Sequence, residues 1–259
     1  MAWRTHDHTL QLAEGHIEVR CAGPAPQQAP TIILLHEGLG CLSRWRDFPE
    51  RLAVATGMGV LAFSRFGYGR SSSITLPRPL DYMTREAVTV LPAVIAAYRV
   101  SEFFLIGHSD GGSIASVFAA RVQNPAAMVL LAPHFFVEDC CTAAITELRQ
   151  AFEMEELAER MAPHHDDVQA AFRGWCDAWL DEAFIRDWNL EADIDDISCP
   201  VLAIQGLEDP YGTRAQYRCW EGRRNFKLLM LPECGHNPVA EQTEQTFQEI
   251  VAFLEANAA

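Results

Sequence analysis

Residues 103–112 read FFLIGHSDGG, an apolar run that leads into the pattern G-x-S-x-G centred on Ser109. The pattern lies between a strand predicted over 102–108 and a helix predicted over about 110–123. A serine on such a sharp strand-to-helix turn exposes its hydroxyl, and the flanking glycines let backbone segments approach closely. The N-terminus of the helix favours negative charge that develops beside it. The stretch therefore predicts a nucleophilic serine at Ser109 rather than a plain glycine-rich turn.

Strands and helices alternate on both sides of this turn. The alternation predicts an α/β fold with a mostly parallel, doubly wound sheet, right-handed crossovers and sites at the carboxyl ends of the strands. A hairpin around Glu14 and Gly15 comes first, and Ser43 is expected to cap a helix that ends before Gly57. The predicted strands are 9–13, 16–21, 31–36, 60–64, 102–108, 126–132, 200–205 and 226–231, and the predicted helices are 43–56, 81–99, 110–123, 213–220 and 239–256.

Residues 134–196 interrupt this alternation. They are rich in Glu, Ala and Asp and contain no convincing strand. We therefore expect an inserted helical cap over 134–196, between a first part of the core over 1–133 and a second part over 197–259. Trp175 and Trp179 have the i, i+4 spacing of helical neighbours. Together with Trp188 they are expected to line an apolar substrate pocket, the alternative being that they only pack the cap on itself.

A base and an acid are expected after later strands. A serine hydroxyl is a poor nucleophile at neutral pH and needs a base, which in turn needs an acid to orient it. The run VLAIQG is followed by Glu208 and Asp209, and the run KLLML is followed by PECGH, which ends at His236. Both positions lie just past predicted strand ends, where side chains converge on Ser109, and their chain order fits such a triad. The residues predict His236 as the base and leave Glu208 and Asp209 open as the acid.

With these motifs in place, the chain resembles the α/β-hydrolase family over nearly its whole length. The resemblance implies a catalytic triad of Ser109, Asp209 and His236, and the family's G-x-x-D spacing favours Asp209 over Glu208. The motifs that carry it are TIILLHEGLG (31–40), SRFGYGRS (64–71), GHSDGG (107–112), GLEDPYG (206–212) and CGHNP (234–238).

Two residues near the implied oxyanion site depart from the family pattern. The resemblance implies that backbone N–H groups of Gly38 and Asp110 bind the oxyanion, so the unusual side chain of Asp110 does not put the triad in doubt. Glu37 stands where the family usually has glycine, and a carboxylate aimed at the oxyanion would oppose catalysis. Because Arg65 follows the strand expected beside that of Glu37, we expect Glu37 to turn away and form an ion pair with Arg65.

Composition narrows the set of partners. The 259 residues carry 35 acidic side chains against 20 Lys and Arg, and the formal net charge of −15 disfavours binding to nucleic acid or membranes. No run approaches the roughly 20 apolar residues of a membrane span, and the start of the chain shows no signal-peptide pattern. The eight cysteines are scattered, and the histidines at 6, 8, 164 and 165 suggest solvated loops rather than metal ligands. We therefore expect a cytoplasmic protein without a metal or cofactor.

The resemblance implies a serine hydrolase that cleaves a carboxylic ester, thioester or lactone with a small apolar or aryl part, through an acyl-enzyme on Ser109. Two other reactions stay open: hydrolytic C–C cleavage of a vinylogous diketone, and cofactor-free perhydrolysis. A non-enzymatic alternative is a ligand receptor whose triad turns over slowly or not at all. In each case the partner is a small molecule, and a homodimer is also left open. For C–C cleavage, an anionic substrate would need cations such as Arg149, Arg160, Arg173 and Arg186.

Overall fold

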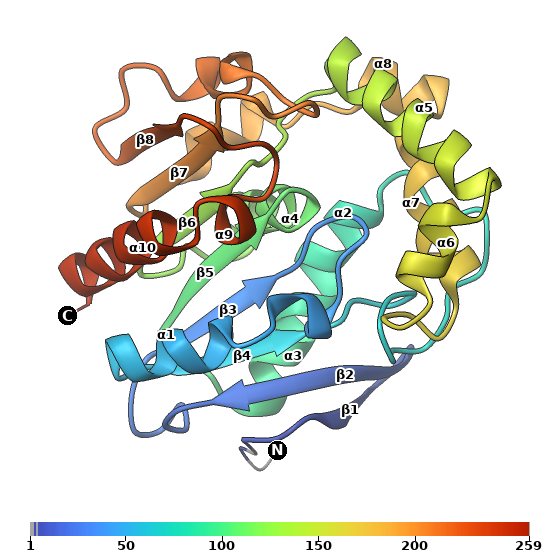
Figure 1. Cartoon of the computed structure of the whole chain (residues 1–259). Helices are drawn as coiled ribbons and strands as arrows, with labels where there is room; N and C mark the ends of the chain where they lie inside the picture. Colours follow the sequence, from blue (N-terminus) through green and yellow to red (C-terminus); the bar gives the residue numbers. More distant parts are fainter. Residues whose placement is uncertain (1–2, 4, 259) are drawn as a thin grey trace.

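One eight-stranded sheet organises the chain, of which the computed structural model describes residue 3 and residues 5–258. The expectation about a signal peptide therefore falls partly on residues outside this range. The strands are β1 (His8–Leu12), β2 (Gly15–Ala22), β3 (Thr31–Leu35), β4 (Gly59–Phe63), β5 (Phe103–His108), β6 (Met128–Leu131), β7 (Val201–Gly206) and β8 (Phe226–Leu231). Their order across the sheet is β1-β2-β4-β3-β5-β6-β7-β8 (Figure 1). β2 is antiparallel to β1 and β4, and all other neighbours are parallel, which confirms the predicted fold class.

Helices cover both faces of this sheet (Figure 1). Side chains alternate between the faces of a strand, so Ile32 of β3 packs with Leu52 on one face while Ile33 packs with Phe118 on the other. Burial on both faces explains why the central strands are continuously apolar. On one face lie α1 (Phe48–Thr56), α9 (Pro238–Glu241) and α10 (Thr243–Asn257). On the other lie α2 (Tyr82–Arg85), the π-helix η2 (Glu86–Val90), α3 (Leu91–Tyr98) and α4 (Asp110–Arg121).

The first crossover helix begins later than the sequence predicts. Ser43 does not cap it but lies in a 3₁₀ turn, η1 (Leu42–Trp45), and Arg46 then adopts a positive φ of 51° that breaks the helical path. Pro49 tolerates only the first turn of a helix, since it lacks an N–H, and α1 accordingly starts one residue before it. Gly57 ends α1 with a left-handed φ of 69°, as predicted.

The chain leaves the sheet after β6 and returns at β7. We call residues 134–196 the helical segment. Its elements are α5 (Asp139–Glu153), α6 (Glu156–Met161), α7 (Val168–Trp179), α8 (Glu182–Asp187) and the 3₁₀ helix η3 (Glu191–Asp196), and its described residues form only one isolated β-bridge, between Phe136 and Asn189. Helices α5 and α7 lie over the carboxyl ends of the central strands (Figure 1). Their side chains line a pocket there.

Between β7 and β8 the predicted short helix is a 3₁₀ helix, η4 (Arg214–Trp220). In the part of the chain that the structure describes, no helix combines the length and apolarity that crossing a membrane requires.

Candidate active site

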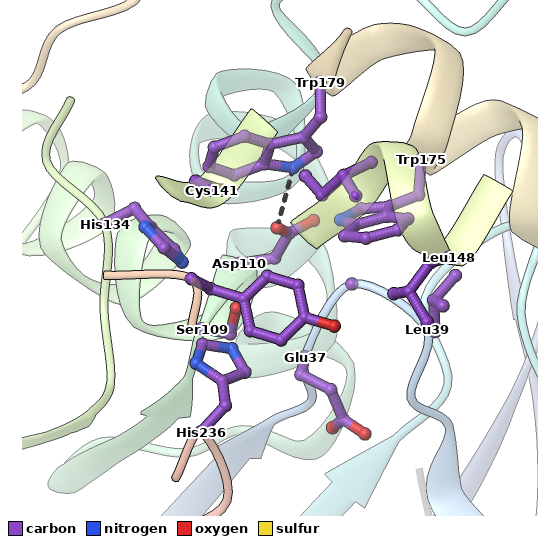
Figure 2. A pocket seen from close by; sticks show the side chains of 13 residues that line it. Glu37, Leu39, Ser109, Asp110, His134, Cys141, Leu148, Trp175, Trp179 and His236 are labelled. Carbon is purple, nitrogen blue, oxygen red and sulfur yellow. Dashed lines mark hydrogen bonds between the residues drawn. The ribbon is translucent and has the colours of Figure 1, made fainter. Parts of the chain in front are cut away.

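Ser109 lies on a strained turn between β5 and α4. Its φ of 52° and ψ of −118° fall in a region that residues other than glycine rarely adopt. Two glycines make the turn possible, because a Cβ at Gly107 would meet the carbonyl oxygen of Gly111, and a Cβ at Gly111 would meet that of Leu35. The turn places the Ser109 side chain in the pocket at the carboxyl ends of the strands (Figure 2).

His236 and Asp209 meet beside this serine, as the sequence predicts. The imidazole Nδ1 lies 2.7 Å from Oδ2 of Asp209, and the carboxylate is 1% exposed, whereas Glu208 is exposed to solvent. Burial raises the pKa of Asp209, but the hydrogen bond and charge of His236 outweigh it, so the pKa lies below its usual value. An ionised Asp209 holds the proton of His236 on Nδ1, which leaves Nε2 to exchange a proton with a substrate or serine.

Two side chains that sequence reasoning missed position this pair. Gln205, at the end of β7, donates a 2.7 Å hydrogen bond from Nε2 to Oδ2 of Asp209. Glu241 of α9 accepts hydrogen bonds from the backbone N–H groups of Gly235 and Asn237, the two neighbours of His236, at 2.7 and 2.9 Å. Gln205 therefore holds Asp209, and Glu241 holds the backbone around His236, through contacts that no short sequence motif predicts.

One pocket contains both the predicted serine and the predicted histidine. Trp175 and Trp179 line it, whereas Trp188, which the sequence also assigns to the pocket wall, does not. Trp188 lies outside the pocket, stacks on Phe184 with ring centroids 5.1 Å apart, and meets Trp179 edge-on at 5.4 Å. The lining residues are Glu37, Gly38, Leu39, Ser109, Asp110, His134, Cys141, Ile145, Leu148, Trp175, Trp179, Tyr211 and His236.

The two predicted oxyanion donors both lie at this pocket. Asp110 is the first residue of α4, so its N–H has no partner within the helix. Gly38 lies under the indole of Trp175, and a Cβ there would collide with the ring. His165, expected in a solvated loop, is instead buried: its Nδ1 accepts from the N–H of Gly69, and its Nε2 lies 3.2 Å from the carbonyl oxygen of Leu39. It therefore braces the backbone next to Gly38.

Glu37 does not form the predicted ion pair with Arg65. Arg65 instead donates from Nη2 to the backbone carbonyl of Glu37 at 2.8 Å, and the Glu37 carboxylate lies 3.6 Å from Nδ1 of His108. β3 lies between β4 and β5, so a residue at its end can face either neighbour, and Glu37 faces β5. Burial alone would raise the pKa of Glu37 and lower that of His108. Their mutual contact outweighs burial, so the pKa of Glu37 is lowered and the pKa of His108 is raised. Figure 2 shows the carboxylate turned away from Ser109, as catalysis requires.

Asp110 is the partner that Arg65 takes instead. Its carboxylate is fully buried, with Nη1 of Arg65 at 3.7 Å. Tyr82 donates a hydrogen bond to Oδ2 at 2.5 Å, and the indole N–H of Trp179 donates to Oδ1 at 3.1 Å (Figure 2). The residue after the candidate nucleophile thus ties α4 to α2 and to α7 of the helical segment.

His134, three residues beyond β6, is a lining residue that sequence reasoning missed. It is 2% exposed, and its Nδ1 is buried without a hydrogen-bond partner. Its ring centroid lies 5.0 Å from that of Trp179 and 5.8 Å from that of His236. Burial, reinforced by the nearby His236, lowers its pKa to about 3, so its imidazole is neutral at pH 7. Its place after a strand end was the available signal.

The charged groups at this pocket are acidic. Among the described residues that line it, Glu37 and Asp110 carry carboxylates and none is Lys or Arg, so the arginines considered for an anionic substrate lie elsewhere. No group of three His, Cys, Asp or Glu side chains within the described ranges is arranged to hold a metal ion.

Comparison with known proteins shows which family this chain is similar to. A model described as "Alpha/beta hydrolase family" matches residues 32–249. Epoxide hydrolase B of Mycobacterium tuberculosis is 32% identical over 98 residues, a stretch that covers 37% of this chain and only 26% of that enzyme. The bifunctional esterase/perhydrolase DCH of Acinetobacter calcoaceticus is 22% identical over 88% of this chain and 93% of its own length. The solved structure of an esterase from Exiguobacterium antarcticum superposes with a TM-score of 0.76 at 17% identity, covering 95% of this chain and 98% of that one.

Proposed function

The chain belongs to the alpha/beta hydrolase family, and from that premise we propose that it is a serine hydrolase that cleaves a carboxylic ester, thioester or lactone of a small apolar or aryl substrate. One observation carries the proposal. Ser109 on its strained turn shares a pocket with His236, and His236 is hydrogen-bonded to the buried Asp209. This is the arrangement that acyl transfer by a serine needs.

In the proposed mechanism, the Ser109 hydroxyl attacks the carbonyl carbon while His236 takes its proton through Nε2. The negative charge on the tetrahedral oxygen is stabilised by the N–H groups of Gly38 and Asp110. His236, now charged and held by Asp209, gives its proton to the leaving group, which departs and leaves an acyl-enzyme. His236 then takes a proton from water as the water attacks the acyl carbon. When the bond between the acyl carbon and Oγ of Ser109 breaks, His236 returns that proton to Oγ, and the acid is released.

The charges at the pocket support a neutral substrate. No Lys or Arg side chain lines the described pocket, so a carboxylate-bearing diketone would find no counter-ion there. Apolar side chains, among them Ile145, Leu148 and the two tryptophans, cover much of the remaining wall. A neutral ester with an apolar or aryl part fits this lining better than the anionic substrate of C–C cleavage.

Turnover of short aryl esters tests the proposal. We expect the wild-type protein to release many equivalents of p-nitrophenol from p-nitrophenyl acetate, and Ser109→Ala to lose at least about a thousandfold in kcat. Ser116→Ala is the matched control, because Ser116 lies in α4, the helix that follows the turn, is not a lining residue of the pocket, and bonds only the carbonyl of Gly112. A single burst without turnover would indicate a receptor, and equal activity in Ser109→Ala would refute the proposed nucleophile.

A further inference from the structure

His134 is the one side chain of the pocket wall with a polar atom that the structure buries and leaves without a partner. Nearly all buried polar atoms in proteins are hydrogen-bonded, since an unpaired one has lost its water without compensation. Nδ1 of His134 has no partner in the described chain, although its backbone is well anchored, with its carbonyl accepting from the hydroxyl of Ser113 at 2.7 Å. The backbone of His134 is therefore held in place, whereas its imidazole makes no hydrogen bond within the described chain.

The position of the ring makes it available to a molecule in the pocket. His134 packs edge-on to Trp179, lies beside His236 and lines the pocket (Figure 2). Nδ1 is on the buried side of the ring, near Gly212, so a molecule in the pocket can reach Nε2, which likewise has no hydrogen-bond partner in the described chain. Of the other buried polar side chains that line the described pocket, Ser109 is the proposed nucleophile, and both carboxylate oxygens of Asp110 accept hydrogen bonds. Apart from Ser109, His134 is therefore the buried polar side chain of the described pocket wall that keeps unused hydrogen-bonding capacity next to His236.

We propose that His134 is a specificity-determining residue whose neutral imidazole hydrogen-bonds a hydroxyl or carbonyl oxygen that the substrate carries beside the ester attacked by Ser109. This inference rests on the proposed function and adds a substrate class to it, namely neutral esters with a polar oxygen near the scissile bond. A neutral imidazole has one N–H donor and one acceptor nitrogen, so a hydroxyl can pair with it in either tautomer. A carboxylate on the substrate is not selected, because none of the described residues that line the pocket is Lys or Arg.

Two pairs of esters, each differing by one hydroxyl, test the inference. The acyl pair is p-nitrophenyl propionate and p-nitrophenyl lactate, and the leaving-group pair is phenyl acetate and 2-hydroxyphenyl acetate, each corrected for its rate of alkaline hydrolysis. We expect the wild-type kcat/KM to favour the hydroxylated member of at least one pair by about tenfold, the effect of one good buried hydrogen bond. In His134→Phe, which keeps a planar ring, that ratio should fall to about 1, and His134→Asn or His134→Gln should restore part of it.

The outcomes separate a structural role from a recognition role. A ratio unchanged in His134→Phe, or a wild type with no preference in either pair, overturns the inference while the proposed function stands. A His134→Phe protein that melts lower but keeps the ratio shows that the residue only packs.

A binding measurement covers the case in which the wild type hydrolyses no ester. Ser109→Ala protein labelled with ¹⁵N-histidine is titrated with phenol and with toluene, and the His134 ring signals are assigned by their loss in His134→Phe. Shifts of those nitrogens with phenol alone support the inference even if the proposed function fails. Absence of such shifts overturns it.

Discussion

Replacing Asp110 by Asn tests the buried network behind the candidate nucleophile. The carboxylate is fully buried and lies 3.7 Å from Nη1 of Arg65, a guanidinium whose Nη1 and Nε have no hydrogen-bond partner in the described chain. Asparagine has the same shape but no charge, so Arg65 loses its nearest counter-charge, and one of the two donors, Tyr82 or Trp179, meets an amide N–H. Removing one partner of a buried ion pair costs about 3–5 kcal/mol. The wide separation of this pair places the expected loss at the lower end, about 3 kcal/mol.

Thermal and urea unfolding followed by circular dichroism measure this loss. At roughly 2–4 °C per kcal/mol for a chain of this size, Asp110→Asn should melt about 6–12 °C below the wild type. Asp187→Asn is the matched control, because Asp187 pairs with Arg186 on the surface, where the side chains are 63% and 68% exposed and solvent screens the pair, so Tm should hardly change. An Asp110→Asn protein that melts with the wild type would show that Asp110 does not compensate the charge of Arg65.

The remaining predictions concern the triad, the tryptophans and Glu37. Because triad members act as a unit, adding His236→Ala to Ser109→Ala should cost almost no further kcat, and additive losses would contradict the assignment. Trp188→Ala should lower Tm and leave the kcat/KM ratio of p-nitrophenyl butyrate to p-nitrophenyl acetate unchanged. Trp175→Ala should raise that ratio, because it enlarges the pocket. The reverse pattern would show that Trp188, not Trp175, lines the pocket. The Tm difference between wild type and Glu37→Gln should be largest between about pH 4.5 and 6.5. The lowered pKa of Glu37 stabilises the fold at pH values above the usual pKa of a glutamate. The raised pKa of His108 stabilises it at pH values below the usual pKa of a histidine, and this contribution is lost as the pH rises, so the Tm difference should shrink toward pH 9. A Tm difference independent of pH would exclude the pair.

The fold and the meeting of His236 with Asp209 follow from sequence because they depend on local signals. A parallel strand buried on both faces is continuously apolar, a nucleophile turn needs glycines at fixed positions, and strand ends gather at one edge of the sheet. The strand from Thr31 and the turn at Ser109 are therefore readable without knowing what packs on them. Gln205, Glu241 and His134 are not. The first two bond groups only four to six residues away, across turns whose geometry the sequence does not specify, and His134 enters the pocket wall only when the helical segment packs over it.

The misassigned partner of Glu37 shows where such reasoning stops. Strand order correctly places Arg65 beside Glu37, yet a residue at the end of a central strand has neighbours on both sides, and the sequence gives no sign of which one its side chain faces. In the structure, the pairing of opposite charges decides which neighbour the Glu37 side chain faces. Asp110 enters the core as a second carboxylate and takes the guanidinium of Arg65, so the Glu37 carboxylate pairs with His108 on the opposite side. Glu37 and Asp110, the two departures from the family pattern, therefore belong to one arrangement. The Asp110 carboxylate pairs with Arg65, the cation that would otherwise pair with Glu37. His108 also contacts the backbone carbonyl of His236 through Nε2 at 2.7 Å, so the displaced carboxylate braces the candidate base instead of opposing the oxyanion.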